Sequence, residues 1–103
     1  MPYFVYITTN PAKSSVYVGM TNNIRRRMKE HYENRGETET FAGRYYCFKL
    51  VYYEYYKTPL EAIEREKEIK KWRREKKEAL IESVNPSWYF LNYTDDFRVG
   101  IIR

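Results

Sequence analysis

Residues 3–20, YFVYITTNPAKSSVYVGM, contain two short apolar stretches on either side of a turn. Residues 3–8 alternate in polarity and are rich in β-forming side chains, which predicts a strand. Asn10 and the proline after it mark a turn, and residues 16–20 predict the returning strand. The chain is therefore expected to begin with a β-hairpin.

The alternation in these strands predicts which side chains share a face. Val5 on the first strand and Val18 on the second lie on the aliphatic sides, which we expect to cover the core. Tyr6 and Tyr17 then emerge together on the other face, with Gly19 beside them. Packing alone also explains two neighbouring tyrosines, and from this pattern it is the simpler explanation.

An amphipathic helix is predicted over residues 24–32, with residues 21–23 supplying its N-cap. The residues at four-residue steps form its expected buried stripe: Ile24, Met28 and Tyr32. Arg27 and His31 are also four residues apart, so they should stack on one flank of this helix.

Beyond a polar loop expected over residues 35–43, residues 47–56 carry the strongest strand signal in the chain. Cys47 alternates within this strand and is expected in the core. The next helix should run from residue 59 to about residue 72, because Thr58 is a good N-cap. The residues after it support this start, since a proline follows directly and Glu61 occupies the capping-box position.

Ala62, Ile63 and Ile69 define the apolar arc of this helix on a helical wheel. Glu66 falls inside that arc, with Lys70 one turn further on. A carboxylate on an inward face is costly unless a cation, a metal or a hydrogen-bond donor meets it. Glu66 is thus either a functional ligand or the structural partner of an arginine.

A further helix is expected over residues 74–83, and Asn85 with the following proline ends it. Residues 88–93 should pack back on the body, and residues 94–103 form a tail of uncertain order. The element order is β-β-α-β-α-α. This order predicts the α+β class, with a small three-stranded antiparallel sheet flanked by three or more helices.

The chain has 103 residues, which suffices for one compact domain but not for two. One cysteine and one histidine exclude an internal disulfide and a zinc site built from Cys and His. These counts, with no signal peptide or membrane span in the sequence, lead us to expect a cytoplasmic protein without a membrane partner.

The formal net charge is +5, and the basic residues gather in two places. Residues 65–77 hold eight basic and three acidic side chains, and residues 25–29 form a second cluster near the only histidine. Basic clusters with aromatic neighbours are typical of nucleic-acid binding. A solvated helix face explains the same charge pattern.

The order and spacing of these polar residues resemble the GIY-YIG nuclease family, especially its small stand-alone members. The family's first tripeptide is matched by residues 4–6, with Phe4 in place of the glycine, and its second by residues 17–19. The arginine, the histidine and the helical glutamate that follow in the family are matched by Arg27, His31 and Glu66. The resemblance spans residues 2–91 and extends to the N-terminal catalytic domain of a repair excinuclease and to the catalytic domains of homing endonucleases.

The resemblance implies one nuclease domain over residues 1–92, with residues 93–103 as a C-terminal tail. It also implies a metal-dependent endonuclease that hydrolyses phosphodiester bonds, with one divalent ion, Mg²⁺ or Mn²⁺, at Glu66. Arg27 would supply positive charge at the phosphate. Either Tyr6 or Tyr17 would position or deprotonate the water, with His31 as the alternative proton carrier. Gly19 would allow close approach of backbone or substrate.

DNA is the expected substrate more than RNA, and six basic residues would contact phosphates: Arg25, Arg26, Lys70, Lys71, Arg73 and Arg74. The chain has no room for a separate recognition domain, so cleavage should be structure-selective or weakly specific. A role in DNA repair or recombination, with a partner protein for targeting, fits this expectation. Two other interpretations remain open: a non-catalytic nucleic-acid-binding module with a tyrosine-rich face, and a docking surface for a protein or an acidic membrane along residues 65–77.

Overall fold

The computed structural model describes residues 2–93, so the expected tail lies outside the described residues except for its first residue, Tyr93. The elements in chain order are β1 (Tyr3–Thr9), β2 (Val16–Thr21), α1 (Ile24–Glu33), α2 (Phe41–Arg44), β3 (Lys49–Tyr56), α3 (Pro59–Lys70), α4 (Arg74–Val84) and the 3₁₀ helix η1 (Leu91–Tyr93). The predicted α+β class and its β-β-α-β-α-α order are confirmed. The short helix α2 is additional, since a polar loop was expected there.

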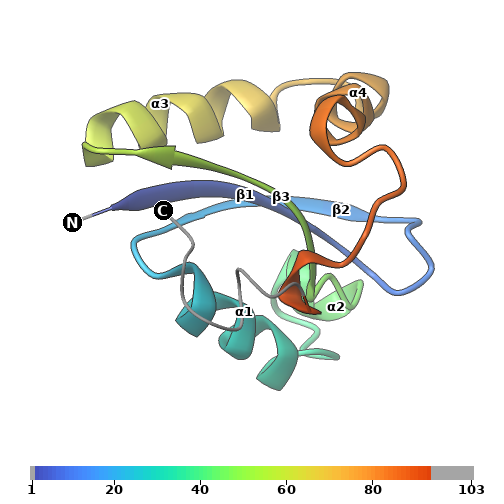
Figure 1. The fold of residues 1–103 in the computed structure, drawn as a ribbon. Coiled ribbons are helices and arrows are strands. Elements are labelled where there is room, and N and C mark those ends of the chain that lie inside the picture. The colour runs from blue at the N-terminus through green and yellow to red at the C-terminus, as the bar shows by residue number, and fades with distance from the viewer. Residues whose placement is uncertain (1, 94–103) are drawn as a thin grey trace.

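The three strands form one antiparallel sheet in the order β2-β1-β3, which makes β2 an edge strand. Helices α3 and α4 lie on one face of this sheet, and α1 and α2 lie on the other (Figure 1). In the register of the hairpin, Tyr6 on β1 pairs with Gly19 on β2, and Thr8 pairs with Tyr17. The alternation of strand side chains therefore puts Tyr6 and Tyr17 on the same face, as predicted.

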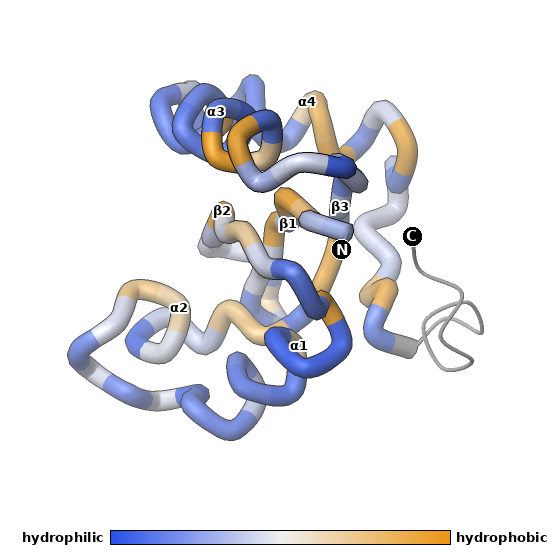
Figure 2. The backbone as a smooth tube through the Cα atoms, turned by 90° about the vertical axis from the view of Figure 1, so that its left-hand side faces the viewer, coloured by the Kyte–Doolittle hydropathy of each residue, from blue (hydrophilic) through white to orange (hydrophobic). Residues whose placement is uncertain are grey.

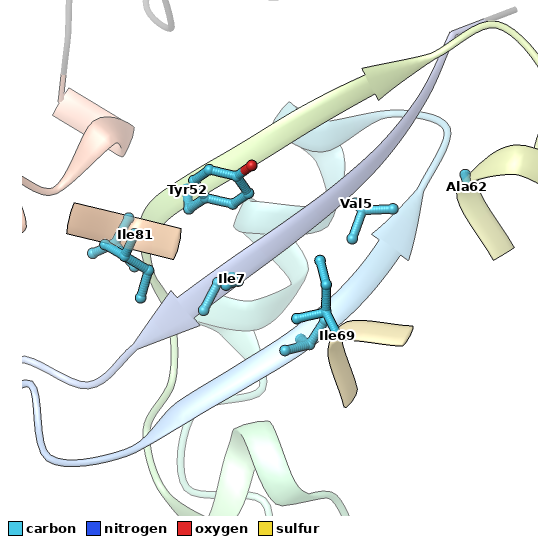
Figure 3. Packing of buried hydrophobic residues seen from close by; sticks show 8 residues of the cluster. Val5, Ile7, Tyr52, Ala62, Ile69 and Ile81 are labelled. Carbon is cyan, nitrogen blue, oxygen red and sulfur yellow. The ribbon is translucent and has the colours of Figure 1, made fainter. Parts of the chain in front are cut away.

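The sheet buries both of its faces, and this differs from the expectation of a core on one side only. Below α3 and α4, the aliphatic residues Val5 and Ile7 pack against Ala62, Ile69 and Ile81 (Figure 3). On the α1 side, a second cluster consists of Phe4, Tyr6, Ile24, Met28 and Leu50. Tyr6 consequently does not emerge from the sheet, because α1 covers it completely.

Helix α1 begins as predicted, with the Asn23 side chain accepting a hydrogen bond from the backbone N–H of Arg26. Ile24 and Met28 are buried, but Tyr32 is 49% exposed and His31 takes its expected place. The cause is the 3.6-residue turn. His31, seven residues after Ile24, lies within about 20° of it around the helix axis, whereas Tyr32 is about 80° away.

The predicted capping of α3 is confirmed, because the Thr58 hydroxyl accepts from the Glu61 backbone N–H and also bonds the Glu61 carboxylate. The helix ends at Lys70, two residues earlier than expected. Its buried seam consists of Ala62 and Ile69, and Ile63 is 37% exposed instead of belonging to the core. Ile63 lies about 100° around the helix from Ala62, which turns it away from the sheet.

The C-terminal segment packs against the start of β3. Cys47 is buried as expected, but it precedes β3 instead of belonging to it, and its backbone N–H donates to the carbonyl of Ala42. Residues 88–93 return to the body as predicted, since the Asn92 side chain accepts from the Leu50 backbone N–H.

None of the helices within residues 2–93 has the length and apolar character that crossing a membrane requires.

Candidate active site

A hydrogen-bonded cluster of three side chains lies between the sheet and α1. The Tyr6 hydroxyl on β1 is 2.8 Å from Nε2 of His31, and Nε of Arg27 donates to the same hydroxyl oxygen over 3.2 Å. The i, i+4 spacing on α1 sets Arg27 and His31 one turn apart on the flank that faces β1. The structure thus brings together three of the predicted site residues.

Burial determines how protons are distributed in this cluster. Burial raises the pKa of the Tyr6 hydroxyl well above its usual range, although the hydrogen bond from Arg27 acts in the opposite direction. Burial, with the positive charge of Arg27 beside it, lowers the pKa of His31 to about 4. At neutral pH the phenol is therefore protonated and the imidazole is neutral. Arg27 donates to the Tyr6 oxygen, and the Tyr6 hydroxyl can in turn donate to Nε2 of His31 in the tautomer that carries the imidazole proton on Nδ1.

The tyrosine rings require a glycine at position 19. A Cβ atom at this position would lie 2.4 Å from Tyr6 Oη and 2.8 Å from Tyr17 Cε2. Both distances are far shorter than van der Waals contact. The absence of a side chain on β2 therefore lets the Tyr6 ring lie across the hairpin and reach α1.

Tyr17 lies at the outer side of the cluster and is only partly buried. Its ring centroid is 6.3 Å from that of Tyr6, and its ring meets the His31 ring edge-on at 5.5 Å. Nζ of Lys70 is 5.9 Å from the centroid of the same ring. Tyr17 thus connects the buried cluster with a cation on α3.

Glu66 approaches from the other face of the sheet. Its helix, α3, packs against β1 and the edge strand β2 (Figure 1). The side chain is 22% exposed and its carboxylate is 3.6 Å from Nζ of Lys70, so the structural partner is a lysine and not an arginine. The charge of Glu66 is among the effects that raise the pKa of Tyr6, after burial. Glu66, Lys70 and Tyr17 therefore meet at the β2 edge, beside the buried cluster.

The donor set at Glu66 is compatible with a hard divalent cation that takes most of its ligands from elsewhere. Within residues 2–93, no three His, Cys, Asp or Glu side chains gather closely enough to hold a metal ion. Mg²⁺ commonly binds proteins through one or two carboxylates and completes its shell with phosphate oxygens and water. Glu66 fits such an ion, for which the nucleic acid would supply further oxygens.

The predicted phosphate contacts differ in how strongly other groups of the protein hold them. Lys70 belongs to the site, whereas Arg74 binds Glu78 at 2.7 Å and donates to the backbone carbonyl of Ser14. Arg26 donates to the Asn22 side chain. The remaining three side chains are exposed: Arg25, Lys71 and Arg73. Arg25 among them also interacts with other groups of the protein.

Two contributors were missed in the sequence. Glu30 accepts a hydrogen bond from Nη1 of Arg27 at 3.1 Å, and its i, i+3 spacing from Arg27 was the available signal. Phe41 on α2 stacks beside Tyr17, with ring centroids 6.4 Å apart and ring planes 24° apart. A helix of four residues has no periodicity, so nothing in the sequence pointed to this contact.

The antiparallel sheet has α1 on one face and α3 on the other, with the Tyr6 and Tyr17 rings packed over Gly19 of β2, and it makes this protein a small α+β domain with a polar cluster at one sheet edge. Residues 2–79 match the GIY-YIG catalytic domain, and the chain belongs to this family.

Its relatives are small proteins of similar length. A UPF0213 protein of Haloquadratum walsbyi is 38% identical over 80 residues, which cover 78% of this chain and 86% of the relative. A UPF0213 protein of Staphylococcus aureus is 38% identical over 79 residues, which cover 77% of this chain and 93% of the relative. The solution NMR structure of the UPF0213 protein of Bacillus halodurans is 33% identical, with a TM-score of 0.54, and the match covers 85% of this chain and 90% of that one.

Proposed function

We propose that this protein is a metal-dependent endonuclease that hydrolyses phosphodiester bonds in DNA, with its active site at the β2 edge. The observation that carries the proposal is the hydrogen-bonded cluster of Tyr6, Arg27 and His31 beside a half-buried carboxylate. Nucleic-acid binding by itself requires no such cluster. Membership of a catalytic-domain family supports the same conclusion.

Arg27 is the group that binds the attacked phosphate. Burial alone would lower its pKa, but hydrogen bonds to Tyr6 and Glu30 raise it above the usual range, so the charge is permanent. These two hydrogen bonds also fix the guanidinium, while 34% of the side chain is exposed. A fixed cation at the point where negative charge develops stabilises the transition state without reorganisation.

Tyr17 and the buried pair have different roles. Tyr17 is the tyrosine with access to solvent, so we assign to it the orientation of the attacking water. The Tyr6 hydroxyl is sealed beneath α1, where it contacts the neutral His31 and accepts a hydrogen bond from Arg27, so we assign to this buried pair the positioning of the Arg27 guanidinium.

Glu66 is the proposed ligand of the divalent cation. When bound, that ion would neutralise charge on the phosphate and on the leaving oxygen. Lys70 holds the carboxylate in place at 3.6 Å and adds positive charge beside Tyr17. We further infer that residues 1–92 act as one nuclease unit, since Asn92 is anchored to the start of β3.

Cleavage of supercoiled, flapped and branched DNA with Mg²⁺ or Mn²⁺ tests the proposal. Wild-type protein should cut at least one of these substrates, and a chelator should stop it. Arg27→Ala and Glu66→Ala should each lower the rate by about a hundredfold or more while the thermal unfolding curve keeps its cooperativity. Glu64→Ala removes an exposed carboxylate from the same helix and should cut normally.

Two results would overturn the nuclease assignment. The first is DNA binding without cleavage of any substrate, which would leave a binding module. The second is an equal cleavage rate for the wild type, Arg27→Ala and Glu66→Ala, because the activity would then come from another protein in the preparation.

A further inference from the structure

Exposed aromatic rings continue outward from the site along α2. Phe41 stacks beside Tyr17, and the Tyr45 ring centroid is 4.6 Å from that of Phe41. Phe41 is 51% exposed and Tyr45 is 44% exposed, so both side chains are accessible to a ligand from solvent. We call these two residues with Tyr17 the aromatic platform. Figure 2 shows α2 below the edge strand β2, on the opposite side from α3.

The platform is held in a fixed position although α2 is short. Thr40 caps the helix by accepting from the Gly43 backbone N–H. A Cβ atom at Gly43 would lie 2.6 Å from the carbonyl oxygen of Glu37, which shows how closely the preceding loop packs against α2. The backbone N–H of Cys47 closes the other end by donating to Ala42. The rings are therefore ordered before any ligand arrives, which lowers the entropic cost of binding to them.

The surrounding charges favour a polyanion that carries flat rings. Lys70 is 5.9 Å from the Tyr17 ring centroid, and Arg44 on α2 is an exposed residue whose guanidinium donates to the backbone carbonyl of Thr38. Glu37 and Glu39 precede α2 in the chain, and their negative charges do not attract a polyanion. The aromatic platform therefore supplies the stacking surface, and the cations of the site supply the electrostatic attraction. Aromatic side chains next to cations are the usual means of binding single-stranded nucleic acid.

We propose that the aromatic platform stacks an unpaired DNA base next to the scissile phosphate, so that the enzyme acts on single-stranded segments. This inference rests on the proposed nuclease function of the same site. In duplex DNA the bases are stacked on each other inside the helix, and their faces cannot reach Phe41 or Tyr45. Unpaired bases in a single strand, flap or junction offer those faces at no such cost.

Binding without metal tests the platform apart from catalysis. A labelled single-stranded oligomer of about 12 nucleotides is compared by fluorescence anisotropy with an abasic oligomer of the same length, in the presence of a chelator. Both carry the same phosphates, so only stacking distinguishes them. Wild-type protein should bind the oligomer with bases about fivefold to about a hundredfold more tightly, the range expected for one stacked base.

The double variant Phe41→Leu with Tyr45→Leu keeps apolar side chains but removes the π faces, and it should reduce this preference to less than about twofold. Tyr55→Leu is the matched control, since Tyr55 is also 44% exposed but lies on β3, the opposite edge of the sheet. Its preference should equal that of the wild type. Equal binding of both oligomers by the wild type, or an unchanged preference in the double variant, would overturn the platform.

The cleavage assay separates this inference from the proposed function. If metal-dependent cutting occurs but single-stranded and duplex segments are cut equally, the proposed nuclease function is supported and the proposed role of the aromatic platform is contradicted. If the protein binds the oligomer with bases more tightly than the abasic oligomer but cuts no substrate, the stacking surface is supported and the proposed nuclease function is contradicted.

Discussion

Acidification should destabilise the folded protein through His31, because this imidazole is buried without its proton. Burial and the charge of Arg27 lower its pKa from 6.5 to about 4. An unfolded chain takes up a proton at this residue near pH 6.5, whereas the folded chain resists it. The unfolded state therefore binds more protons between these two values, and the free energy of unfolding must fall as the pH falls through this window.

The magnitude follows from the two pKa values. A difference from 6.5 to about 4 corresponds to about 3 kcal/mol once the pH is below both, and about 2 kcal/mol of it is lost by about pH 5. Little should change above about pH 7.5. This is a large part of the stability of a domain of this size.

Urea unfolding from about pH 8 to about pH 4 measures the effect, with His31→Gln as the control. Glutamine can accept the Tyr6 hydrogen bond but does not titrate, and carboxylates that titrate in the same range are common to both proteins. The difference in unfolding free energy between the two proteins should change by about 2 kcal/mol between about pH 8 and about pH 5. A pH-independent difference would refute a neutral, buried His31.

Two further substitutions test the packing. Gly19→Ala should cost about 1–3 kcal/mol of stability in urea unfolding, because its Cβ would displace the buried Tyr6 ring, and a cost below about 0.5 kcal/mol would contradict the close approach. Ile69→Ala should cost about 2–5 kcal/mol in the same measurement, whereas Ile63→Ala on the same helix should cost less than about 1 kcal/mol because Ile63 is 37% exposed. Equal costs at the two positions would mean that α3 packs on a different face.

The strands and the shared face of Tyr6 and Tyr17 could be predicted because the period of a strand is two residues and admits one assignment. Burial of that face could not be predicted. Alternating tyrosines and phenylalanines are compatible with both solvent and core, and only the docking of α1 decides between them. Counting in four-residue steps placed Tyr32 in the core and left out His31, which lies closer to Ile24 around the helix axis and contacts Tyr6.

The site residues on α1 could be paired from their spacing, but the approach of Glu66 could not be derived from any local pattern. The approach of Glu66 depends on β2 being the edge strand. At this edge, side chains of α3 on one face of the sheet come close to Tyr17 on the other face, through the contacts of Lys70 with both Glu66 and Tyr17. Strand order is set by contacts between distant segments. The position of Phe41 escaped prediction for a different reason, since four residues are too few to show a helical period.

Tyr6 has the largest of the fully buried side chains. Replacing its ring with a small side chain would hollow out the layer beneath α1, whatever became of catalysis. A descendant that had abandoned catalysis would still be selected to keep an aromatic ring here. Comparison of distant family members should therefore look to Arg27, which is partly exposed and fills less of the buried layer than Tyr6, for signs that the chemistry has been lost.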